Sequence, residues 1–275
     1  MRDRKDINLT FYVTAHEMAH QWWAHQVVGA DMQGATVIVE TLAQYSALMV
    51  MEKEYGADYM RRFIKFEMDT YLSSRGGELI EELPLLLTEN QPYLHYRKGS
   101  VVMYALRNEM GEANLNRALK NFLNRFAFKG APFPTAQDLL DDIRACAPAE
   151  SQALITDLFE RITLYDLEVS DAQVEARDDK QQTTITIEAS KFIADGKGVE
   201  SAAPLDQWVD IALLPEADPD IHDNVLPKPL VLERHRLVTG KNEVRIESTT
   251  RPVRVVVDPY LKLIDRKPDN NIKTL

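Results

Sequence analysis

The sequence predicts a multi-domain protein of the α plus β class, in which a mainly helical part is followed by an antiparallel β-sandwich. Apolar residues in the first part recur at helical spacing, whereas from about residue 165 short runs alternate polar and apolar residues with period two. Gly, Pro, Asn and Asp separate these later runs. We therefore expect a helical domain over residues 1–165 and a sandwich over residues 166–275.

Seven helices are expected in the first part. The second ends before Gly56, a residue favoured just beyond a helix end, and the third carries aromatic residues at the spacing of a buried stripe. Thr135 can cap the start of the sixth through its hydroxyl. The expected ranges are residues 11–28, 40–55, 57–74, 98–110, 112–126, 135–145 and 149–162.

The second part has the pattern of a small all-β domain. Residues 183–187, 243–247 and parts of 252–258 alternate with period two, and five or six other short runs are rich in residues that favour strands. Turn-forming residues follow at short intervals, for example at 178–179, 196–198 and 239–242. Strands at this spacing predict an antiparallel sandwich of roughly seven strands.

Charge and composition exclude several classes of function. The net charge of −11 is spread evenly, with 17 basic and 22 acidic residues in 1–165 and 15 and 21 in 166–275, so we expect no nucleic-acid partner. Cys146 is the only cysteine, which rules out an intrachain disulfide. No histidine lies near it in sequence, so a nucleophilic role for Cys146 is not expected. No apolar run reaches the length of a membrane span, and the first residues do not resemble a signal peptide.

The segment His16-Glu17-Met18-Ala19-His20 carries the main functional signal. Residues four apart share one face of a helix, so His16 and His20 can direct two imidazoles to one metal ion, with Glu17 beside them as a general base. This is the HExxH pattern of zinc peptidases, which also need a third protein ligand. A competing interpretation makes Thr14 and Glu17 a capping box with two packed histidines, but it does not explain both histidines on one face.

Three residues downstream are candidates for the third ligand: His25, Asp31 and Glu40. His25 is turned away from the ligand face, and Asp31 lies in a Gly-punctuated loop. Glu40 opens an apolar helix that can pack rigidly against the first one, and a ligand on a rigid element is held better than one on a loop. A glutamate is also favoured in a first helical turn by the helix dipole. Trp23 and Gln26 exclude the continuation that metzincins need.

Three motifs in one order connect the chain with a known family. His-Glu-Met-Ala-His-Gln-Trp at 16–22, Glu-Thr-Leu-Ala-Gln-Tyr at 40–45 and Tyr-Arg-Lys-Gly at 96–99 resemble the membrane alanyl aminopeptidase family of gluzincins. The longer segments Ala-His-Gln-Val-Val-Gly-Ala-Asp at 24–31 and Glu-Thr-Leu-Ala-Gln-Tyr-Ser-Ala at 40–47 are most similar to peptidase-like domains fused to bacterial ABC-transporter permeases. The family resemblance covers about residues 10–130.

This resemblance implies a thermolysin-like catalytic half that acts on a peptide substrate. It implies one Zn²⁺ held by His16, His20 and Glu40, with Glu17 as the general base. It also implies that Tyr96 hydrogen-bonds the tetrahedral intermediate.

Several residues near the motifs have simpler interpretations. Without the resemblance, Tyr96 is an aromatic residue that packs before a helix, and nothing local favours it over the neighbouring Tyr93 for a role in the site. We assign no role to Lys98, which suits a solvated charge in a first turn. Core positions are expected for Trp22 and Trp23, and surface or packed positions for the remaining histidines, His95, His222 and His235.

The chain departs from the family pattern in two ways. Nineteen residues separate His20 from Glu40, one more than is usual, and the loop at 29–34 can absorb the addition. The family's upstream Gly-x-Met-x-Asn strand and amine-binding domain are absent here. We therefore expect a fragment of a longer parent protein, which need not be active alone. The similarity to permease-fused domains makes a membrane-anchored parent one alternative, which the sequence leaves open.

The expected reaction is zinc-dependent peptide hydrolysis of the aminopeptidase type. A thermolysin-like endopeptidase and a non-catalytic zinc-holding module of a membrane transporter remain alternatives.

Overall fold

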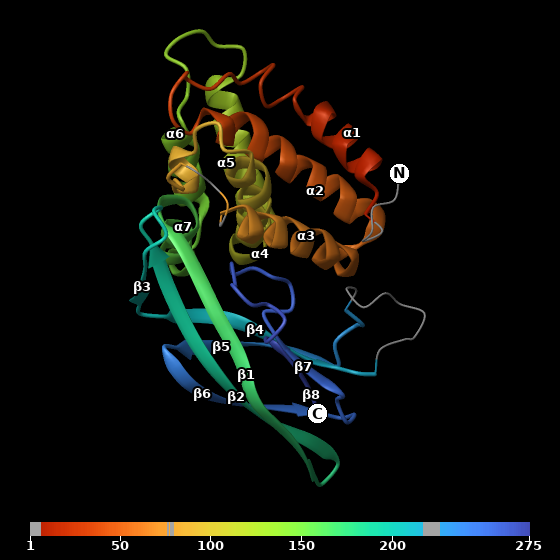
Figure 1. Ribbon diagram of the computed structural model, residues 1–275. Helices are drawn as coiled ribbons and strands as arrows, with labels where there is room; N and C mark the ends of the chain where they lie inside the picture. Colours follow the sequence, from red (N-terminus) through yellow and green to blue (C-terminus); the bar gives the residue numbers. More distant parts are fainter. Residues whose placement is uncertain (1–6, 76, 78–79, 217–225) are drawn as a thin grey trace. The chain divides into compact units, whose positions relative to one another are not determined.

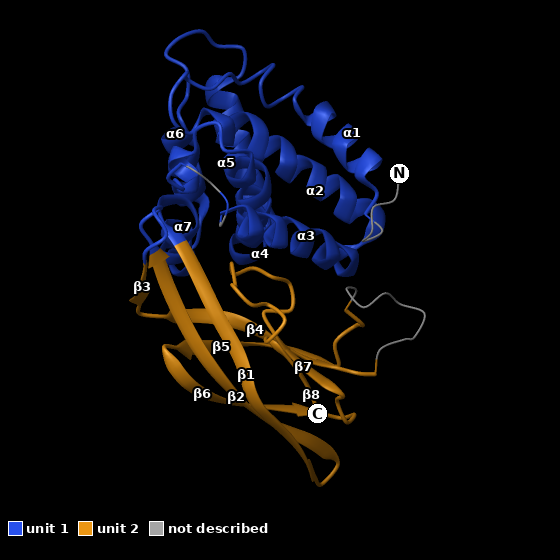
Figure 2. Cartoon of the chain, viewed as in Figure 1, with its two compact units in different colours: residues 1–162, 194–199 blue, residues 163–193, 200–275 orange. Residues whose placement is uncertain are grey.

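The computed structural model describes residues 7–75, 77, 80–216 and 226–275. The chain forms two compact units (Figure 2). Unit 1 contains residues 1–162 and 194–199, and unit 2 contains residues 163–193 and 200–275. Helices make up the first unit and antiparallel sheets the second, so the predicted α plus β class is confirmed. The change from helix to strand falls at residue 162, close to the predicted 165.

Unit 1 is built from α-helices joined by short 3₁₀ and π turns (Figure 1). Three of the short elements, η1, η3 and η5, are π-helical. In chain order the elements are α1 (Leu9–Ala19), η1 (Val37–Thr41), α2 (Leu42–Tyr55), α3 (Ala57–Arg75), η2 (Leu85–Leu87), η3 (Tyr93–Lys98), α4 (Gly99–Met110), α5 (Glu112–Phe126), α6 (Ala136–Cys146), η4 (Ala149–Ser151), α7 (Gln152–Ile155) and η5 (Thr156–Glu160).

Helix α4 forms the centre of this unit. Residues from Gly99 to Leu106 are buried along its first two turns, and it contacts α2, α3 and α5. A helix that is apolar all round in this way belongs in a core. Helix α1 packs on α2, which brings the HExxH segment against the helix that follows Glu40. Among the described residues, no helix is long and apolar enough to cross a membrane.

Glu40, which was expected to open the second helix, lies in the π turn η1 before α2. Two further predicted helices differ clearly from the observed ones. The first was expected to run to residue 28, but α1 ends at Ala19. Beyond it Ala24 has a φ of 119°, which no helix accommodates, and Trp23 forms an isolated bridge with Val27. The last predicted helix is divided into η4, α7 and η5. By contrast, α5 spans the predicted 112–126, and Thr135 caps α6 in a capping box with Asp138.

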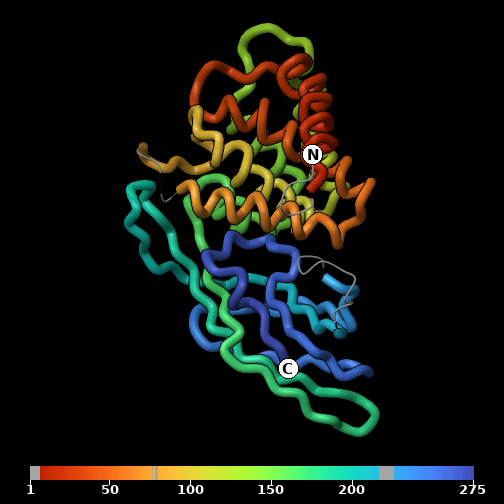
Figure 3. Tube along the Cα trace, turned by 45° about the vertical axis from the view of Figure 1, so that its right-hand side comes forward, coloured from red at the N-terminus to blue at the C-terminus, as the bar shows by residue number. Residues whose placement is uncertain are grey.

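Unit 2 consists of two four-stranded sheets. One has the order β1-β2-β3, with β6 also paired to β2, and the other has the order β5-β4-β7-β8. Figure 3 shows the long hairpin of β1 and β2, whose turn places Asp178 at a φ of 50°. The strands are β1 (Ile162–Arg177), β2 (Lys180–Ala194), β3 (Glu200–Ala203), β4 (Asp206–Leu214), β5 (Val231–Val238), β6 (Gly240–Ser248), β7 (Arg254–Val257) and β8 (Ile272–Thr274).

Alternation along the strands explains which side chains are buried. On β2, Thr183, Ile185 and Ile187 are fully buried, and Ile185 lies opposite Val244 of β6. Residues two apart share one face of a strand, so the predicted period-two runs correspond to the buried faces. In the second sheet, Ala212 of β4 pairs with Val256 of β7 within a buried apolar cluster.

Candidate metal centre

Helix α1 presents both motif histidines on one face. It begins at Leu9 and is capped by the Asn8 side chain, which accepts a hydrogen bond from the Phe11 amide at 3.0 Å. His16 is only 7% exposed, and His20 follows at the C-cap with helical φ and ψ. The two imidazole rings lie 4.7 Å apart, centroid to centroid. This spacing follows from the i, i+4 geometry of a helix.

The alternative interpretation of this segment as a capping box is wrong. Thr14 lies inside α1 rather than at its start, because the helix begins five residues earlier. Its hydroxyl donates a hydrogen bond to the Thr10 carbonyl at 2.8 Å, an ordinary contact for a threonine within a helix.

Glu40 reaches the two histidines from the π turn η1. Its Oε2 atom lies 3.2 Å from Nε2 of His16 and 3.7 Å from Nε2 of His20. One ligand atom from each of the three residues lies within 4.8 Å of the others, and no second group of this kind occurs among the described residues. Burial raises the pKa of Glu40, but the neighbouring His16, Tyr96 and His20 outweigh it and hold that pKa below its usual value.

The spacing of these atoms fits a zinc ion. Ligands at 2.0–2.1 Å from a tetrahedral zinc are about 3.3 Å apart, close to the two distances measured to Glu40. Its Oε2 atom is buried and faces Nε2 of both histidines. Because a buried carboxylate needs a compensating positive charge, a cation among these three side chains would offset the cost of its burial.

A hydrogen bond to the backbone fixes the orientation of the His20 ring. Nδ1 of His20 lies 2.8 Å from the Trp23 carbonyl oxygen. Since a carbonyl only accepts, Nδ1 carries a hydrogen, and Nε2 is the ring nitrogen on the side of Glu40. Metal-binding histidines use this arrangement to fix ring and tautomer. The early end of α1 thus contributes to the site, because the turn after it supplies this carbonyl.

Tyr96 and Glu17 flank the three converging side chains. Tyr96 comes from the π turn η3, and its ring lies 5.8 Å from that of His16. Burial, followed by the charges of Glu40 and Glu17, raises the pKa of Tyr96 to about 12. The phenol therefore keeps its proton at neutral pH and acts as a donor. Glu17 is exposed on α1, one residue beyond His16.

The other candidates lie elsewhere. His25 and Asp31 are exposed and are not part of the cluster. Tyr93 is turned toward Tyr71, with the two rings stacked at 6.2 Å. His95 is buried and packs edge-on against Tyr96, with ring centroids 4.3 Å apart.

His235 pairs with Glu233 at 3.1 Å on β5, and His222 lies outside the described residues. Trp23 is buried, and its ring N–H donates to Ser46. The expectation of a core position was wrong for Trp22, which is 47% exposed.

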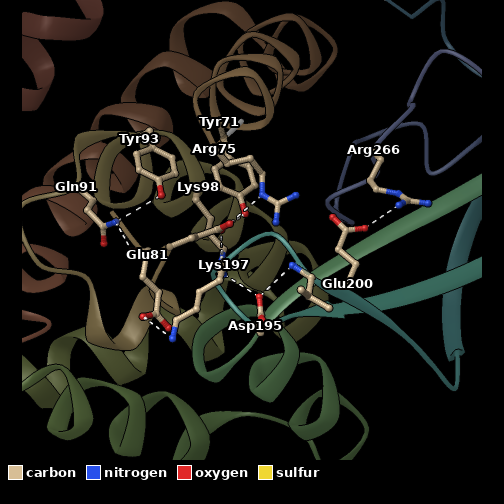
Figure 4. Close-up of polar contacts among 12 residues, drawn as sticks. Tyr71, Arg75, Glu81, Gln91, Tyr93, Lys98, Asp195, Lys197, Glu200 and Arg266 are labelled. Carbon is tan, nitrogen blue, oxygen red and sulfur yellow. Dashed lines mark hydrogen bonds and ion pairs between the residues drawn. The ribbon is translucent and has the colours of Figure 1, made fainter. Parts of the chain in front are cut away.

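Lys98 is also placed differently from its predicted position as a solvated charge. It is fully buried, and its Nζ lies 3.7 Å from Oε1 of Glu82, with which it forms an ion pair. The Glu82 carboxylate accepts hydrogen bonds from Tyr71 and Arg75. Figure 4 shows Lys98 beside Tyr71 and Arg75. Burial, partly offset by Glu82, lowers the pKa of Lys98 to about 8. No feature of the sequence indicated this cluster, because its members come from three separate segments.

The sequence model of the Peptidase family M1 domain matches residues 2–161. The chain is also similar to endoplasmic reticulum aminopeptidase 2 of Homo sapiens, with 27% identity over 126 residues. That match covers 43% of this chain and 13% of the human protein, far less than two thirds of its length. Since the family match extends over more than half of the chain and includes all the residues of the candidate metal centre, this protein belongs to peptidase family M1.

Proposed function

We propose that this protein is a zinc-dependent aminopeptidase whose metal ion is held by His16, His20 and Glu40. The observation that carries the proposal is the meeting of three ligand atoms, within 4.8 Å of one another, from α1 and η1. Family membership supports peptide hydrolysis in general, and the name of the human relative supports the aminopeptidase type. The sequences at 24–31 and 40–47 resemble those of peptidase-like domains fused to bacterial permeases and support a place beside them.

The residues divide the chemistry among them. When bound, a zinc ion supplies Lewis acidity, which polarises a peptide carbonyl and lowers the pKa of water toward about 7. Glu17 lies on α1 one residue beyond His16, where it would take a proton from the attacking water and deliver it to the leaving amine. Its exposure leaves the carboxylate accessible to a substrate.

Tyr96 would stabilise the transition state. Its phenol keeps its proton at neutral pH because its pKa is about 12, so it can donate a hydrogen bond to the oxyanion that forms on the scissile carbonyl. Removing one such donor typically lowers the rate by roughly 10²–10³-fold. We expect Tyr96→Phe to show a loss of that size in kcat while zinc remains bound.

The test combines zinc content with hydrolysis of an aminoacyl anilide. We expect Glu17→Gln to bind one zinc ion per chain and to lose turnover, and His20→Ala to lose the metal. His25→Ala is the matched control, because His25 is an exposed histidine five residues away that does not belong to the cluster. Normal turnover by Glu17→Gln, or equal metal loss from His25→Ala, would contradict the assignment.

A second pair of substrates separates the possible peptidase types. An aminopeptidase cleaves a peptide with a free amino terminus and spares the same peptide after N-acetylation. Equal cleavage of both would instead indicate an endopeptidase. Zinc binding without cleavage of either peptide would indicate a non-catalytic metal-holding module.

A further inference from the structure

The two π turns of the metal centre are joined by one buried hydrogen bond. The hydroxyl of Thr41, the residue after Glu40, donates to the backbone carbonyl of His95, the residue before Tyr96, at 2.7 Å. Thr41 is fully buried and His95 is 5% exposed. In a π turn the regular i→i−4 hydrogen bonds are displaced, so a side-chain donor at this carbonyl fixes backbone that the helix pattern alone holds less tightly.

The two turns are also in close steric contact at this point. Gly99 follows η3, and a Cβ atom placed on it would lie 2.7 Å from both Oγ1 and Cγ2 of Thr41. The absence of a side chain at Gly99 therefore lets Thr41 approach closely enough to make its hydrogen bond. Threonine is stiff at χ1 because it is β-branched, which keeps the hydroxyl directed at the carbonyl.

The His95 side chain continues this contact to the Tyr96 ring. Its imidazole packs on Tyr96 at 4.3 Å with an interplanar angle of 69°, and His16 lies at 5.8 Å from the same ring at 62°. Tyr96 is thus held by edge-on contacts with two imidazoles, a favoured geometry for rings. Burial lowers the pKa of His95 to about 4, so the ring packs as a neutral group.

We propose that Thr41 and His95 are positioning residues that fix Tyr96 relative to Glu40, which makes the Thr41–His95 contact part of the catalytic geometry. The proposal rests on the proposed function of Tyr96. It predicts that removing the Thr41 hydroxyl affects the reaction through Tyr96. A purely structural role for the same hydrogen bond would lower stability and leave the Tyr96 ring in place.

The decisive pair of variants is Thr41→Val and Thr41→Ser in the full chain. Valine keeps the branched shape and removes the hydroxyl, whereas serine keeps the hydroxyl and removes the methyl group. With ¹³C-labelled tyrosine rings, the Tyr96 signal is the one missing from the spectrum of Tyr96→Phe. We expect that signal to shift or broaden in Thr41→Val and to stay unchanged in Thr41→Ser. Both spectra are recorded on metal-free protein, where we expect the same difference. The signals of the other nine tyrosines are internal references.

Turnover gives the second measurement. We expect Thr41→Val to lower kcat about tenfold at constant zinc content, and to change kcat less than twofold in the Tyr96→Phe background. Equal losses in both backgrounds, or an unmoved Tyr96 signal, would overturn the proposal. If Tyr96→Phe itself retains full kcat, the proposed role of Tyr96 fails, and the ring spectrum still decides whether the contact positions it.

A second pair of variants, at His95, tests the proposal if Thr41→Val does not fold. His95→Leu removes the ring that contacts Tyr96, and His95→Phe retains an aromatic ring of similar shape. We expect the Tyr96 signal to move in His95→Leu and to stay close to its original position in His95→Phe. The opposite order would overturn the proposal.

Discussion

Replacing Gly99 with alanine sets two opposing effects against each other. Gly99 has helical φ and ψ of −56° and −42° and begins α4. At an exposed helical position, glycine to alanine stabilises a protein by up to about 1 kcal/mol. Here the added Cβ would lie 2.7 Å from two atoms of Thr41 and 3.2 Å from a third. Contacts below 3.0 Å require movement, and overpacking of a buried site costs about 1–3 kcal/mol.

The steric cost should be the larger of the two effects. Thr41 is fully buried and cannot rotate without losing its hydrogen bond to His95. We therefore expect Gly99→Ala to lower the free energy of unfolding by about 1–2 kcal/mol, measured by urea denaturation of chelator-treated protein. Adding Thr41→Ala to Gly99→Ala removes Oγ1 and Cγ2 of Thr41, the two atoms closest to the new Cβ. The double variant should therefore recover part of the lost unfolding free energy, because residues in contact show such coupling.

Gly130→Ala is the control for a change of the same chemical size. No heavy atom lies within 4 Å of a Cβ built at Gly130, and its φ is ordinary. We expect its effect on stability to stay within about 0.5 kcal/mol. The steric reasoning would be refuted if Gly99→Ala were as stable as the unchanged protein, or if Thr41→Ala and Gly99→Ala were simply additive.

Three further predictions test other parts of the molecule. Zinc at 100 times its Kd should stabilise metal-free protein by about 2.7 kcal/mol; calorimetry should show this gain in His25→Ala and not in Glu40→Ala. Burial, opposed by Arg97, raises the pKa of the Glu67 carboxyl group to about 7. The stability that this raised pKa contributes is therefore fully present below about pH 4.5, and it is lost as the pH rises through 7. Urea unfolding at pH 5 and pH 8 should show a smaller loss in Glu67→Gln than in the unchanged protein, and equal losses would contradict the assignment. Thr135→Ala should cost about 1 kcal/mol of unfolding free energy by removing the cap of α6, with zinc content unchanged; a drop in bound zinc would show that α6 also supports the metal centre.

Local signals in the sequence predicted those elements whose ends are set by local chemistry. Helix α5 spans the predicted 112–126, and it starts after Gly111, which has a φ of 82°. Helix α6 starts at the predicted cap, Thr135. The end of α1 was missed because it depends on contacts distant in sequence, among them the hydrogen bond from the Trp23 ring to Ser46 on α2. The apolar periodicity beyond His20 reflects this turn and its bridge rather than a continued helix.

The parts of the candidate site differ in how directly the sequence encodes them. His16, Glu17 and His20 could be grouped from spacing alone, since all three lie within five residues of one helix. Tyr96 followed only from the family resemblance, because nothing local distinguishes it from Tyr93, which turns toward Tyr71 instead. The burial of Lys98 could not be predicted, since its charge is accommodated by Glu82, a carboxylate sixteen residues away in sequence.

Glu40 and Tyr96 share a feature that explains why spacing is a weak guide to them. Both lie in π turns, η1 and η3, whereas His16 lies in the regular helix α1 and His20 is its C-cap. A π turn contains one residue more than the α turn it replaces, so η1 offers a place for the additional residue of the His20–Glu40 spacing at the ligand itself, besides the loop at 29–34. The direction of Glu40 is then set by the elements that η1 contacts, which are α2, α4, α6 and, through Thr41, η3. In this arrangement we expect the packing of the two turns, rather than the exact residue count, to set how Glu40 faces the histidines.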